Sequence, residues 1–547
     1  MDPPLPRLDA TLSRRQMLGA LGLGAAGALG LSSRALAASR PLAASRPLAA
    51  SSTRTVARAA AARPAGSDLG AVEHVVFLMM ENRSYDHYFG SYRRGRGFDD
   101  HPAGSLGNFA QVYPGGGSLT PPGVLLPFHL DTSASAGEAC TNDLTHNWGP
   151  MHQCWNGGRM DAFAAVHTRP SNEGANGAMT MGYYTRADLP FYYALADAFT
   201  LCDAYHCSIL GPTHPNRLMA NSGTIDPAGR QGGPVTDTNP DPTVRWSCTW
   251  TTVQEVLEDA GIAWKVYHPS SVDAGVRYAS LNAYPSWDPL LYDPTLNPAV
   301  MLATDHVLPY FRAFEDPAST LYQKAFGPTF PGEFARDIAA GTLPSVSWLI
   351  PPLGFDDHPS ATPERGMWFT SLVLDALASN PGVWSKTVLF LMYDENDGWF
   401  DHVAPPTPPP GTPDEELTTT KALATDTFGI RGPLGLGVRV PMLVMSPFSR
   451  GGHIASETFD HTSQLQFLHA RFGIEVPNVS RWRRKSVGDL TSTLFRSRPD
   501  HTPPRLPAVP LTPVALSGTC NEVSEESELG GAHPVVPRRQ SMPTQER

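Results

Sequence analysis

Two apolar runs in the chain each end abruptly in acidic and amide side chains. Residues 75–80 lead directly into Glu81 and Asn82, and a second run leads into Asp394 and Glu395. Both runs are too short to cross a membrane, and their continuous apolar character predicts strands buried on both faces. Open α/β sheets place their sites at the carboxyl ends of such strands. Two buried strands that end in oxygen ligands therefore predict a metal held between strand ends.

Apolar runs and amphipathic stretches alternate along the rest of the chain. The predicted strands cover residues 75–80, 263–267, 345–350, 387–393 and 441–446, and the predicted helices cover residues 251–260, 369–378 and 463–472. This alternation is typical of an α/β fold with a predominantly parallel sheet and helices on both faces. The chain also contains 54 Pro and 49 Gly, which indicates long connecting loops over a compact sheet.

The ends of the chain differ in composition from its middle. Arg14 and Arg15 form a twin-arginine pattern. It is followed by a Gly/Ala-rich apolar run and by small residues near Ala37. The next stretch contains a near-duplicate hexapeptide and is rich in Ala, Ser, Arg and Pro, a composition that forms no packed core. The predicted segments are a twin-arginine signal peptide at 1–38, a flexible linker at 39–70, a catalytic domain at 71–496 and a Pro-rich, disordered tail at 497–547.

Charge is distributed unevenly along the sequence. The formal net charge of −11 corresponds to +7 on residues 1–63, which hold nine Arg and two Asp, and to −18 on residues 64–547. Residues 64–547 are therefore strongly acidic and lack the positively charged surface with which proteins bind nucleic acids. We expect no nucleic-acid partner. These residues also lack the polybasic surface that attracts anionic lipid. If the protein acts on lipid, a zwitterionic headgroup is therefore favoured.

Six cysteines are few for 547 residues, so the core is expected to stabilise the fold without a disulfide framework. Export to an oxidising compartment would favour bridges between Cys140 and Cys154 and between Cys202 and Cys207, because both loops are short. Spacing alone leaves the pairing open. No arrangement of Cys and His resembles a zinc ribbon.

Five polar motifs follow one another between residues 72 and 495. They are ENRSYDHYFG at 81–90, HNW at 146–148 with WNGGRMD at 155–161, GPTHPNR at 211–217, YDENDGWFDHV at 393–403 and DHTS at 460–463. In this order they resemble the bacterial phosphoesterase family that holds phospholipases C and the related acid phosphatases. The resemblance implies an alkaline-phosphatase-like sheet and the hydrolysis of phosphate esters.

The motif GPTHPNR contains the candidate nucleophile, Thr213. Gly and Pro set a tight turn there, and a helix that starts just after it would direct backbone N–H groups at an incoming phosphate. An ordinary hydroxyl is too weak an acid to attack at neutral pH, so coordination to a cation is the natural activator. The alternative role of Thr213 is a helix N-cap. By resemblance, Thr stands where phospholipases C carry it, whereas the acid phosphatases tend to carry Ser.

The resemblance and the strand ends together predict a metal shell made of Glu81, Asn82, Thr213, Asp394 and Glu395. Three carboxylates, one amide and one hydroxyl suit a hard divalent cation, whereas Zn²⁺ usually prefers a His or Cys ligand. The cofactor is therefore a divalent metal ion, with Ca²⁺, Mg²⁺, Mn²⁺, Fe and Zn²⁺ left open.

Other candidate site residues follow from the motifs. By resemblance, His146 and His358 point at the phosphate pocket, where an imidazole can protonate the departing alkoxide. Family members often carry Ser-Glu before the second of these histidines, whereas this chain has Asp356 and Asp357. The sequence leaves the roles of two sets of residues open. Asp460 and His461 either support the site or bind a second metal. A second set either binds phosphate and choline or has structural roles; its members are Arg217, Trp148, Trp155 and Tyr184.

These observations predict a secreted or cell-envelope phospholipase C. It would hydrolyse phosphatidylcholine-type lipids at a membrane surface to diacylglycerol and phosphocholine, and its other partner would be the twin-arginine export machinery. One alternative is a broad-specificity acid phosphatase or phosphodiesterase of the same family. The other is an exported lipid-binding protein that has lost catalysis, which would show a gap in the metal shell or the nucleophile; the sequence shows none.

Overall fold

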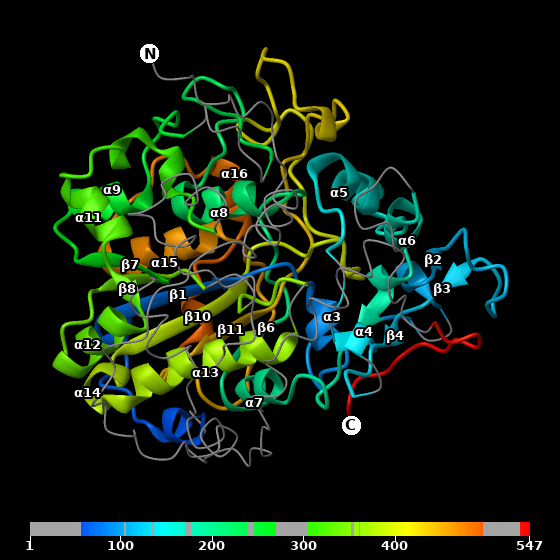
Figure 1. Ribbon diagram of the computed structural model, residues 1–547, viewed down its shortest axis with the longest axis horizontal. Helices are drawn as coiled ribbons and strands as arrows, with labels where there is room; N and C mark the ends of the chain where they lie inside the picture. The colour runs from blue at the N-terminus through cyan, green and yellow to red at the C-terminus, as the bar shows by residue number, and fades with distance from the viewer. Residues whose placement is uncertain are drawn as a thin grey trace, which may run out of the picture.

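The central feature of the fold is an eight-stranded sheet with the order β12-β6-β11-β10-β1-β9-β7-β8 (Figure 1). The computed structural model describes residues 56–102, 105–133, 136–139, 141, 143–169, 177–237, 245–269, 305–351, 355–359, 362–495 and 536–547. The strands are β1 (His74–Met80), β6 (Thr200–Cys202), β7 (Trp264–Pro269), β8 (Thr329–Phe330), β9 (Val346–Leu349), β10 (Thr387–Tyr393), β11 (Met442–Met445) and β12 (Ile454–Ala455).

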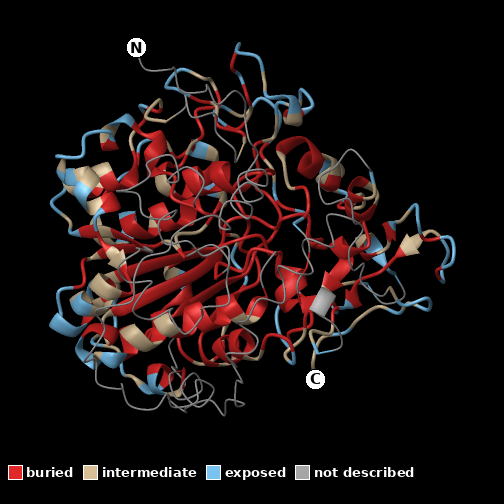
Figure 2. Ribbon diagram, in the orientation of Figure 1, coloured by how far each residue is buried: buried red, intermediate tan, exposed pale blue. Residues whose placement is uncertain are grey.

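The sheet is mostly parallel. Strand β1 pairs in parallel with both β9 and β10, and β7 pairs in parallel with β8 and β9. Only β11 runs antiparallel to its two neighbours, β10 and β6. All seven residues of β10 and six of the seven in β1 are buried, as their uninterrupted apolar character predicts (Figure 2). The five predicted strands are confirmed.

Helices cover both faces of the sheet (Figure 1). On one side lie α8 (Thr213–Ser222), α9 (Val253–Asp259) and α15 (Thr462–Phe472), and on the other lie α7 (Pro190–Ala198) and α13 (Pro363–Ser379). The three predicted helices correspond to α9, α13 and α15. The predicted α/β class, with a mostly parallel sheet between two helical layers, is therefore confirmed.

A smaller group of elements lies beyond the carboxyl end of β1, to the right of the sheet in Figure 1. It includes α3 (Tyr85–Phe89), α5 (Trp148–Trp155), α6 (Phe163–His167), β2 (Gln111–Val112), β3 (Val124–Leu125), β4 (Phe128–His129) and β5 (Gly182–Tyr183). Strand β2 pairs with β3, and β4 pairs with β5. This group stands over the sheet edge at which an open α/β fold places its site.

Both predicted terminal segments are shorter than expected, because part of each packs against the domain. Residues 56–61 form a helix in which Val56 is fully buried, and Arg450 Nη1 donates to the Ala60 carbonyl at 2.5 Å. At the other end, Gln540 Nε2 donates to the Val124 carbonyl at 2.8 Å, and Glu546 pairs with Arg186 at 2.8 Å. Residues 536–547 are thus no disordered tail. The signal peptide and the rest of the linker and tail lie outside the described residues.

The predicted disulfides are wrong. Cys154 and Cys207, one partner of each predicted bridge, are free and buried. Cys202 lies in β6, opposite Met442, whereas the Cys207 thiol donates to the Ile209 carbonyl at 3.4 Å. Cys140 lies outside the described residues. Within the described part of the chain, no helix is long and apolar enough to span a bilayer.

Candidate active site

The site begins where the carboxyl ends of β1 and β10 meet. The two strands pair in register up to Met80 and Tyr393, so Glu81 and Asp394 follow at the same edge. Asp394 N–H donates to the Met80 carbonyl at 3.1 Å, and Asn82 N–H donates to Asp394 Oδ1 at 3.3 Å. The four side chains that the sequence singled out at these strand ends are completely buried. The expected meeting of the two acidic ends is observed.

Asn82 holds an unusual backbone conformation, with φ of +63°. Asn tolerates this left-handed region better than most residues, but the conformation still costs about 1 kcal/mol or more. The bond from Asn82 N–H to Asp394 fixes it. Strain of this kind concentrates at functional sites, because the surrounding structure must over-determine it.

Thr213 is the first residue of α8, and the N-cap position belongs to Pro212. The alternative role of Thr213 as an N-cap is therefore excluded. Arg217, one turn further along α8, donates from Nε to Asp394 Oδ2 at 2.9 Å and from Nη2 to the Met80 carbonyl at 3.3 Å. These bonds hold the first turn of α8 against the ends of β1 and β10.

Several buried polar atoms of this site have no hydrogen-bond partner among the described residues. They are Asn82 Oδ1 and Nδ2, Thr213 Oγ1 and Glu395 Oε1. Burying such atoms unpaired is costly, so native structures seldom do it without a ligand or ion. Burial also raises the pKa of the Glu395 and Asp394 carboxyls above their usual range, most strongly at Glu395. An oxygen-rich set of this composition fits a hard divalent cation.

The structure adds two acidic residues that sequence reasoning did not select. Carboxylate oxygens of Glu81, Asp305 and Asp356 lie within 4.8 Å of one another, and all three residues are buried. Asp356 could have been suspected, because it precedes His358 in the loop where the family resemblance breaks. Asp305 carries no sequence signal, since only the tertiary fold brings it to the end of β1.

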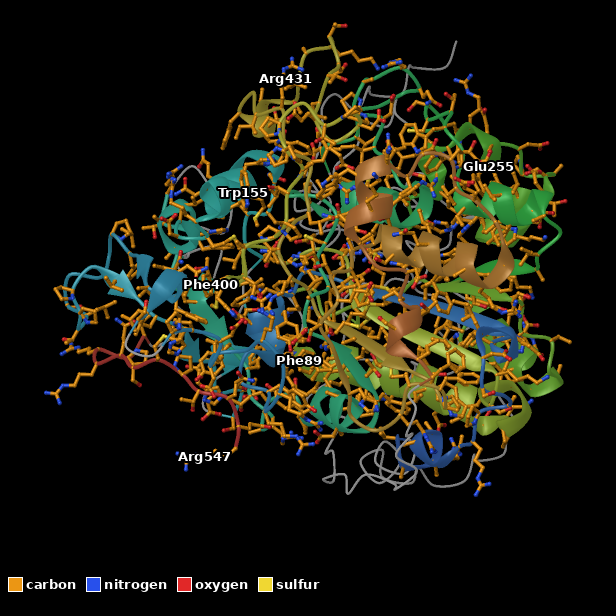
Figure 3. All side chains as sticks on the ribbon, turned by 180° about the vertical axis from the view of Figure 1, so that it is seen from behind. Phe89, Trp155, Glu255, Phe400, Arg431 and Arg547 are labelled. Carbon is orange, nitrogen blue, oxygen red and sulfur yellow. The ribbon has the colours of Figure 1, made fainter. Side chains whose placement is uncertain are left out.

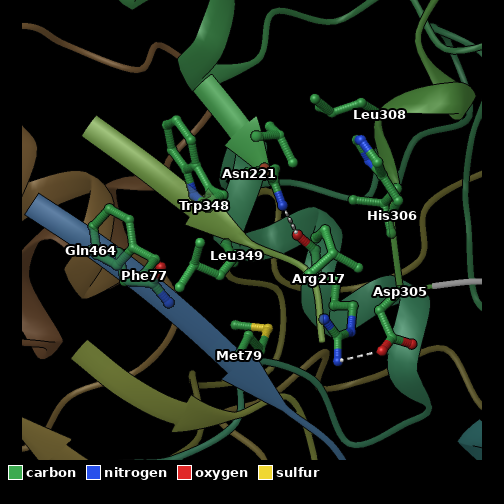
Figure 4. A pocket seen from close by; sticks show the side chains of 14 residues that line it. Phe77, Met79, Arg217, Asn221, Asp305, His306, Leu308, Trp348, Leu349 and Gln464 are labelled. Carbon is green, nitrogen blue, oxygen red and sulfur yellow. Dashed lines mark hydrogen bonds and ion pairs between the residues drawn. The ribbon is translucent and has the colours of Figure 1, made fainter. Parts of the chain in front are cut away.

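Of the two roles that the sequence left open for Arg217, phosphate binding and a structural role, its contacts favour the structural one. Its Nη2 lies 3.5 Å from Glu81 Oε1 and 3.4 Å from Asp305 Oδ2, in addition to its bond with Asp394. Figure 4 shows the pair of Arg217 and Asp305 at one end of a pocket lined by Met79 and other side chains. The guanidinium therefore neutralises the acidic shell in this structure instead of facing an open phosphate pocket.

Two histidines flank the acids. His146 Nε2 lies 3.6 Å from Glu395 Oε1, and His146 Nδ1 lies 2.9 Å from Asp397 Oδ1. Burial alone would lower the pKa of His146, but the nearby carboxylates of Glu395 and Asp397 raise it well above its usual value. His358 Nε2 lies 3.8 Å from Glu81 Oε2. The two imidazoles that the resemblance selected thus contact the ends of both acidic strands.

Asp460 and His461 support the site from behind. Asp460 accepts hydrogen bonds from Ser208 at 2.8 Å and from Arg483 at 2.5 Å. His461 Nε2 donates to the backbone carbonyl of Asp394 at 2.6 Å, and burial lowers the pKa of this imidazole to about 4. Of the two roles left open by the sequence, the contacts favour support over coordination of a second metal.

Two of the three aromatic residues expected to form a choline cage are committed elsewhere. Trp148 is fully buried, stacks on His152 with a centroid distance of 4.8 Å and donates its indole N–H to the Ile430 carbonyl. Tyr184 is also buried, and its hydroxyl donates to the Glu138 carbonyl at 2.8 Å. Their rings belong to the core, so of the two roles that the sequence left open these contacts favour the structural one. Trp155 is half-buried and remains a candidate.

A buried charge network ties the two acidic motifs together. Arg439 Nη2 lies 3.0 Å from Asp86 Oδ1, and Arg439 Nε lies 2.9 Å from Asp401 Oδ1. His402 Nδ1 lies 2.7 Å from Asp86 Oδ2. Although burial raises the pKa of Asp86, His402 and Arg439 lower it below its usual value. Since Asp86 follows β1 and Asp401 follows β10, Arg439 fixes the two ligand-bearing segments relative to each other.

Replacing Arg439 by Met should leave two buried carboxylates without their cation. We expect a loss of about 3–5 kcal/mol in the free energy of unfolding, measured by urea titration with excess divalent cation. Arg159→Met is the matched control, because the Arg159 side chain is 66% exposed and its ion pair with Asp161 contributes at most about 1 kcal/mol. Equal losses in the two variants would contradict this interpretation.

Hydrolysis of a phosphate ester needs a nucleophile, positive charge around the phosphoryl oxygens and a proton for the leaving group. The site contains a hydroxyl at Thr213, acidic side chains that could hold a cation and two imidazoles, which are residue types that can supply these functions. The model of the Phosphoesterase family matches residues 72–475. The chain therefore belongs to the phosphoesterase family.

Two curated relatives cover most of the chain. It is 42% identical over 509 residues to Phospholipase C A of Mycobacterium tuberculosis (strain H37Rv), an alignment that covers 90% of this chain and 91% of that protein. It is 43% identical over 510 residues to Non-hemolytic phospholipase C of Burkholderia pseudomallei, covering 90% of this chain and 68% of that protein. The predicted enzyme class, a phosphoric diester hydrolase, is confirmed by these matches.

One solved structure of similar fold is a protein in the alkaline phosphatase superfamily from Vibrio parahaemolyticus. It is 9% identical to this chain, with a TM-score of 0.30. The alignment covers 80% of this chain and 78% of that protein. The fold class assigned above rests on the topology of the sheet itself.

Proposed function

We propose that this enzyme is a metal-dependent phospholipase C that cleaves phosphatidylcholine-type lipids into diacylglycerol and phosphocholine through Thr213. The observation that supports it best is the buried hydroxyl of Thr213 at the start of α8, which has no hydrogen-bond partner among the described residues, and neither do Asn82 Oδ1 and Glu395 Oε1 at the two strand ends. The relatives named phospholipase C cover nearly the whole chain, which supports this choice within the family.

Glu81, Asn82, Thr213, Asp394 and Glu395 would hold the cation. When bound, a divalent cation supplies a Lewis acid that lowers the pKa of a hydroxyl and offsets charge on phosphoryl oxygens. The Thr213 side chain contributes the attacking oxygen. Because Thr213 opens a ten-residue helix, the positive end of the α8 dipole lies beside the phosphate.

The reaction proceeds in two steps on this chain. Thr213 Oγ attacks phosphorus and gives up its hydroxyl proton to solvent, a Thr Oγ–P bond forms, and the bond from phosphorus to the glycerol oxygen breaks. The departing alkoxide takes a proton from an imidazole, for which His146 and His358 are the two candidates at the strand ends. Water then attacks the phosphocholine ester of Thr213 and returns a proton to that imidazole, the Thr Oγ–P bond breaks, Thr213 regains its proton from solvent, and phosphocholine leaves.

Asp397 orients one of these imidazoles. Its carboxylate bonds His146 Nδ1 at 2.9 Å and accepts from Leu144 N–H at 3.0 Å. With Nδ1 occupied, Nε2 is the nitrogen that faces Glu395 and the strand ends. The arrangement keeps one tautomer and one ring orientation, which proton transfer at a fixed atom requires.

A comparison of two substrates tests the proposed specificity. At equal enzyme and cation concentration, we expect turnover of phosphatidylcholine to exceed that of an aryl phosphate monoester by at least about tenfold, because the site would be matched to a diester with a choline group. Liberated phosphocholine and p-nitrophenol are measured in parallel. A preference for the monoester would instead identify a broad-specificity acid phosphatase.

We also propose that the enzyme is exported by the twin-arginine route and reaches its phospholipid outside the cytoplasm or at the cell envelope. The Arg14–Arg15 pattern and the small residues near Ala37 support the route. That route carries folded proteins, which suits an enzyme that acquires its metal before export.

A further inference from the structure

One aromatic residue near the site is exposed. Among the described residues, the exposed large apolar side chains are Leu106, Val112 and Phe428, with 39%, 60% and 53% of their surface accessible. Phe428 is the one aromatic residue of the three. Single exposed apolar residues are common on protein surfaces, so this ring becomes informative only through its conformation and its position.

The backbone of Phe428 is held in a conformation that suits glycine better. Its φ is +53°, in the left-handed region, and it ends the short 3₁₀ helix η10 (Thr425–Thr427). Bulky side chains rarely occupy this region, whereas Gly and Asn do so readily. Gly429 follows with φ of +73°. A helix end alone does not explain a phenylalanine at this position.

Apolar residues lie on both sides of the Thr425–Thr427 turn that leads to the ring, and we call residues 421–431 the apolar loop. Ala422 and Ala424 are exposed, and Leu423 is half-buried against the core. The base of the loop is fixed at both ends, because Lys421 Nζ donates to the Gly233 carbonyl at 2.7 Å and Arg431 Nη1 donates to backbone carbonyls. The loop therefore presents its ring from a tethered base.

The apolar loop lies directly on α5. Trp148 donates its indole N–H to the Ile430 carbonyl at 3.1 Å. A side chain at Gly149 would collide with the ring of Phe428 and with the Asp426 carbonyl, so the absence of a Cβ is what allows this close approach. Figure 1 shows the yellow loop beside α5, and Figure 3, from behind, shows Arg431 near Trp155.

Helix α5 connects this loop to the site. It begins at Trp148, two residues after His146, whose Nε2 lies 3.6 Å from Glu395 Oε1. Gly149, against which Phe428 packs, is only three residues from His146, which lies just before the N-cap of α5. The exposed ring and the candidate catalytic imidazole are thus held by the same short segment.

We propose that the apolar loop inserts Phe428 into the headgroup region of a zwitterionic phospholipid surface and so brings the mouth of the site to the membrane. The inference rests on the proposed lipid substrate. Aromatic side chains bind at the level of lipid headgroups, and a tethered loop loses little conformational entropy on binding. The net charge of −18 after residue 63 provides no general attraction to anionic lipid, so insertion of an apolar ring is the mechanism left for adsorption.

The test compares two variants on two substrates. Phe428→Asn removes the ring and keeps a residue that tolerates the left-handed backbone. Val112→Thr is the matched control, because Val112 is more exposed but lies on β2, away from α5. Hydrolysis of phosphatidylcholine vesicles and of soluble p-nitrophenyl phosphocholine is measured with excess divalent cation. Flotation of Thr213→Ala protein with phosphatidylcholine vesicles, with and without Phe428→Asn, measures binding separately.

We expect Phe428→Asn to lower the rate on vesicles about tenfold, to leave the rate on the soluble diester within about twofold, and to reduce flotation, while Val112→Thr changes none of these. Unchanged vesicle hydrolysis and flotation would overturn the inference. So would equal losses on both substrates, because the ring would then act through the packing of α5. If the wild-type enzyme cleaves neither substrate, the proposed function fails, and flotation alone decides whether the loop binds membranes.

Discussion

Replacing Thr213 by Ala should reduce turnover of phosphatidylcholine by a factor on the order of 10⁴ or more, because the attacking oxygen is removed from a site whose other groups cannot replace it. The change should cost little stability. Thr213 Oγ1 has no hydrogen-bond partner among the described residues, so the Ala side chain leaves no buried group newly unpaired. Activity is measured by release of phosphocholine, and stability by thermal unfolding.

Two further measurements make this test specific. Thr213→Ser retains a hydroxyl at the start of α8 and should retain measurable turnover, so it serves as the matched control. Acid quenching of the wild-type enzyme during turnover of phosphatidylcholine should yield a peptide that contains Thr213 and carries phosphocholine, and the Ala variant should yield none. Near wild-type turnover by Thr213→Ala would eliminate this residue as the nucleophile.

Removing the cation, or one of its carboxylate ligands, should also abolish activity, because the Thr213 hydroxyl would then no longer be activated. Glu395→Gln keeps the size of the side chain but removes one negative charge from the shell. We expect metal content to fall from about one ion per chain and activity to fall with it. Elemental analysis and turnover are measured on the same preparations. Glu475→Gln, at a side chain that is 65% exposed, is the matched control.

Binding of the cation should increase the free energy of unfolding. Burial and the like charge of Asp394 raise the pKa of Glu395, so the ionised shell destabilises the metal-free protein. Cation at about 100 times its Kd should therefore stabilise the wild-type protein by about 2.7 kcal/mol. Metal-free Glu395→Gln should unfold at the same temperature as the metal-free wild type or higher, and should gain little from added cation. Full activity in metal-free wild-type enzyme would refute a metal-dependent mechanism.

The sheet could be predicted because its strands are continuous apolar runs that end in abrupt polar residues. Thr387–Tyr393 is both the predicted and the observed extent of β10. The same local pattern identified Glu81 and Asp394, since residues that directly follow paired parallel strands must lie at one sheet edge. His146 and His358 came from resemblance, because nothing in their local sequence distinguishes them from other histidines.

What could not be predicted depends on contacts between distant segments. Arg439 lies in an ordinary stretch of sequence, and only the fold places it between Asp86 and Asp401. The role of Arg217 stayed open because sequence does not reveal that three acids surround it. The roles of Trp148 and Tyr184 stayed open for a similar reason, since an aromatic residue of a binding site and one of the core look alike in sequence.

The buried thiols make the enzyme a reporter of its own unfolding. Cys154, Cys207 and Cys248 lie in different segments of the chain, each with at most 1% of its surface accessible, and burial raises the pKa of Cys248 to about 12. Protonated, shielded thiols react with alkylating reagents only when the protein around them opens. The rate of alkylation at each thiol, read by mass spectrometry, therefore maps local opening across the domain without any introduced label.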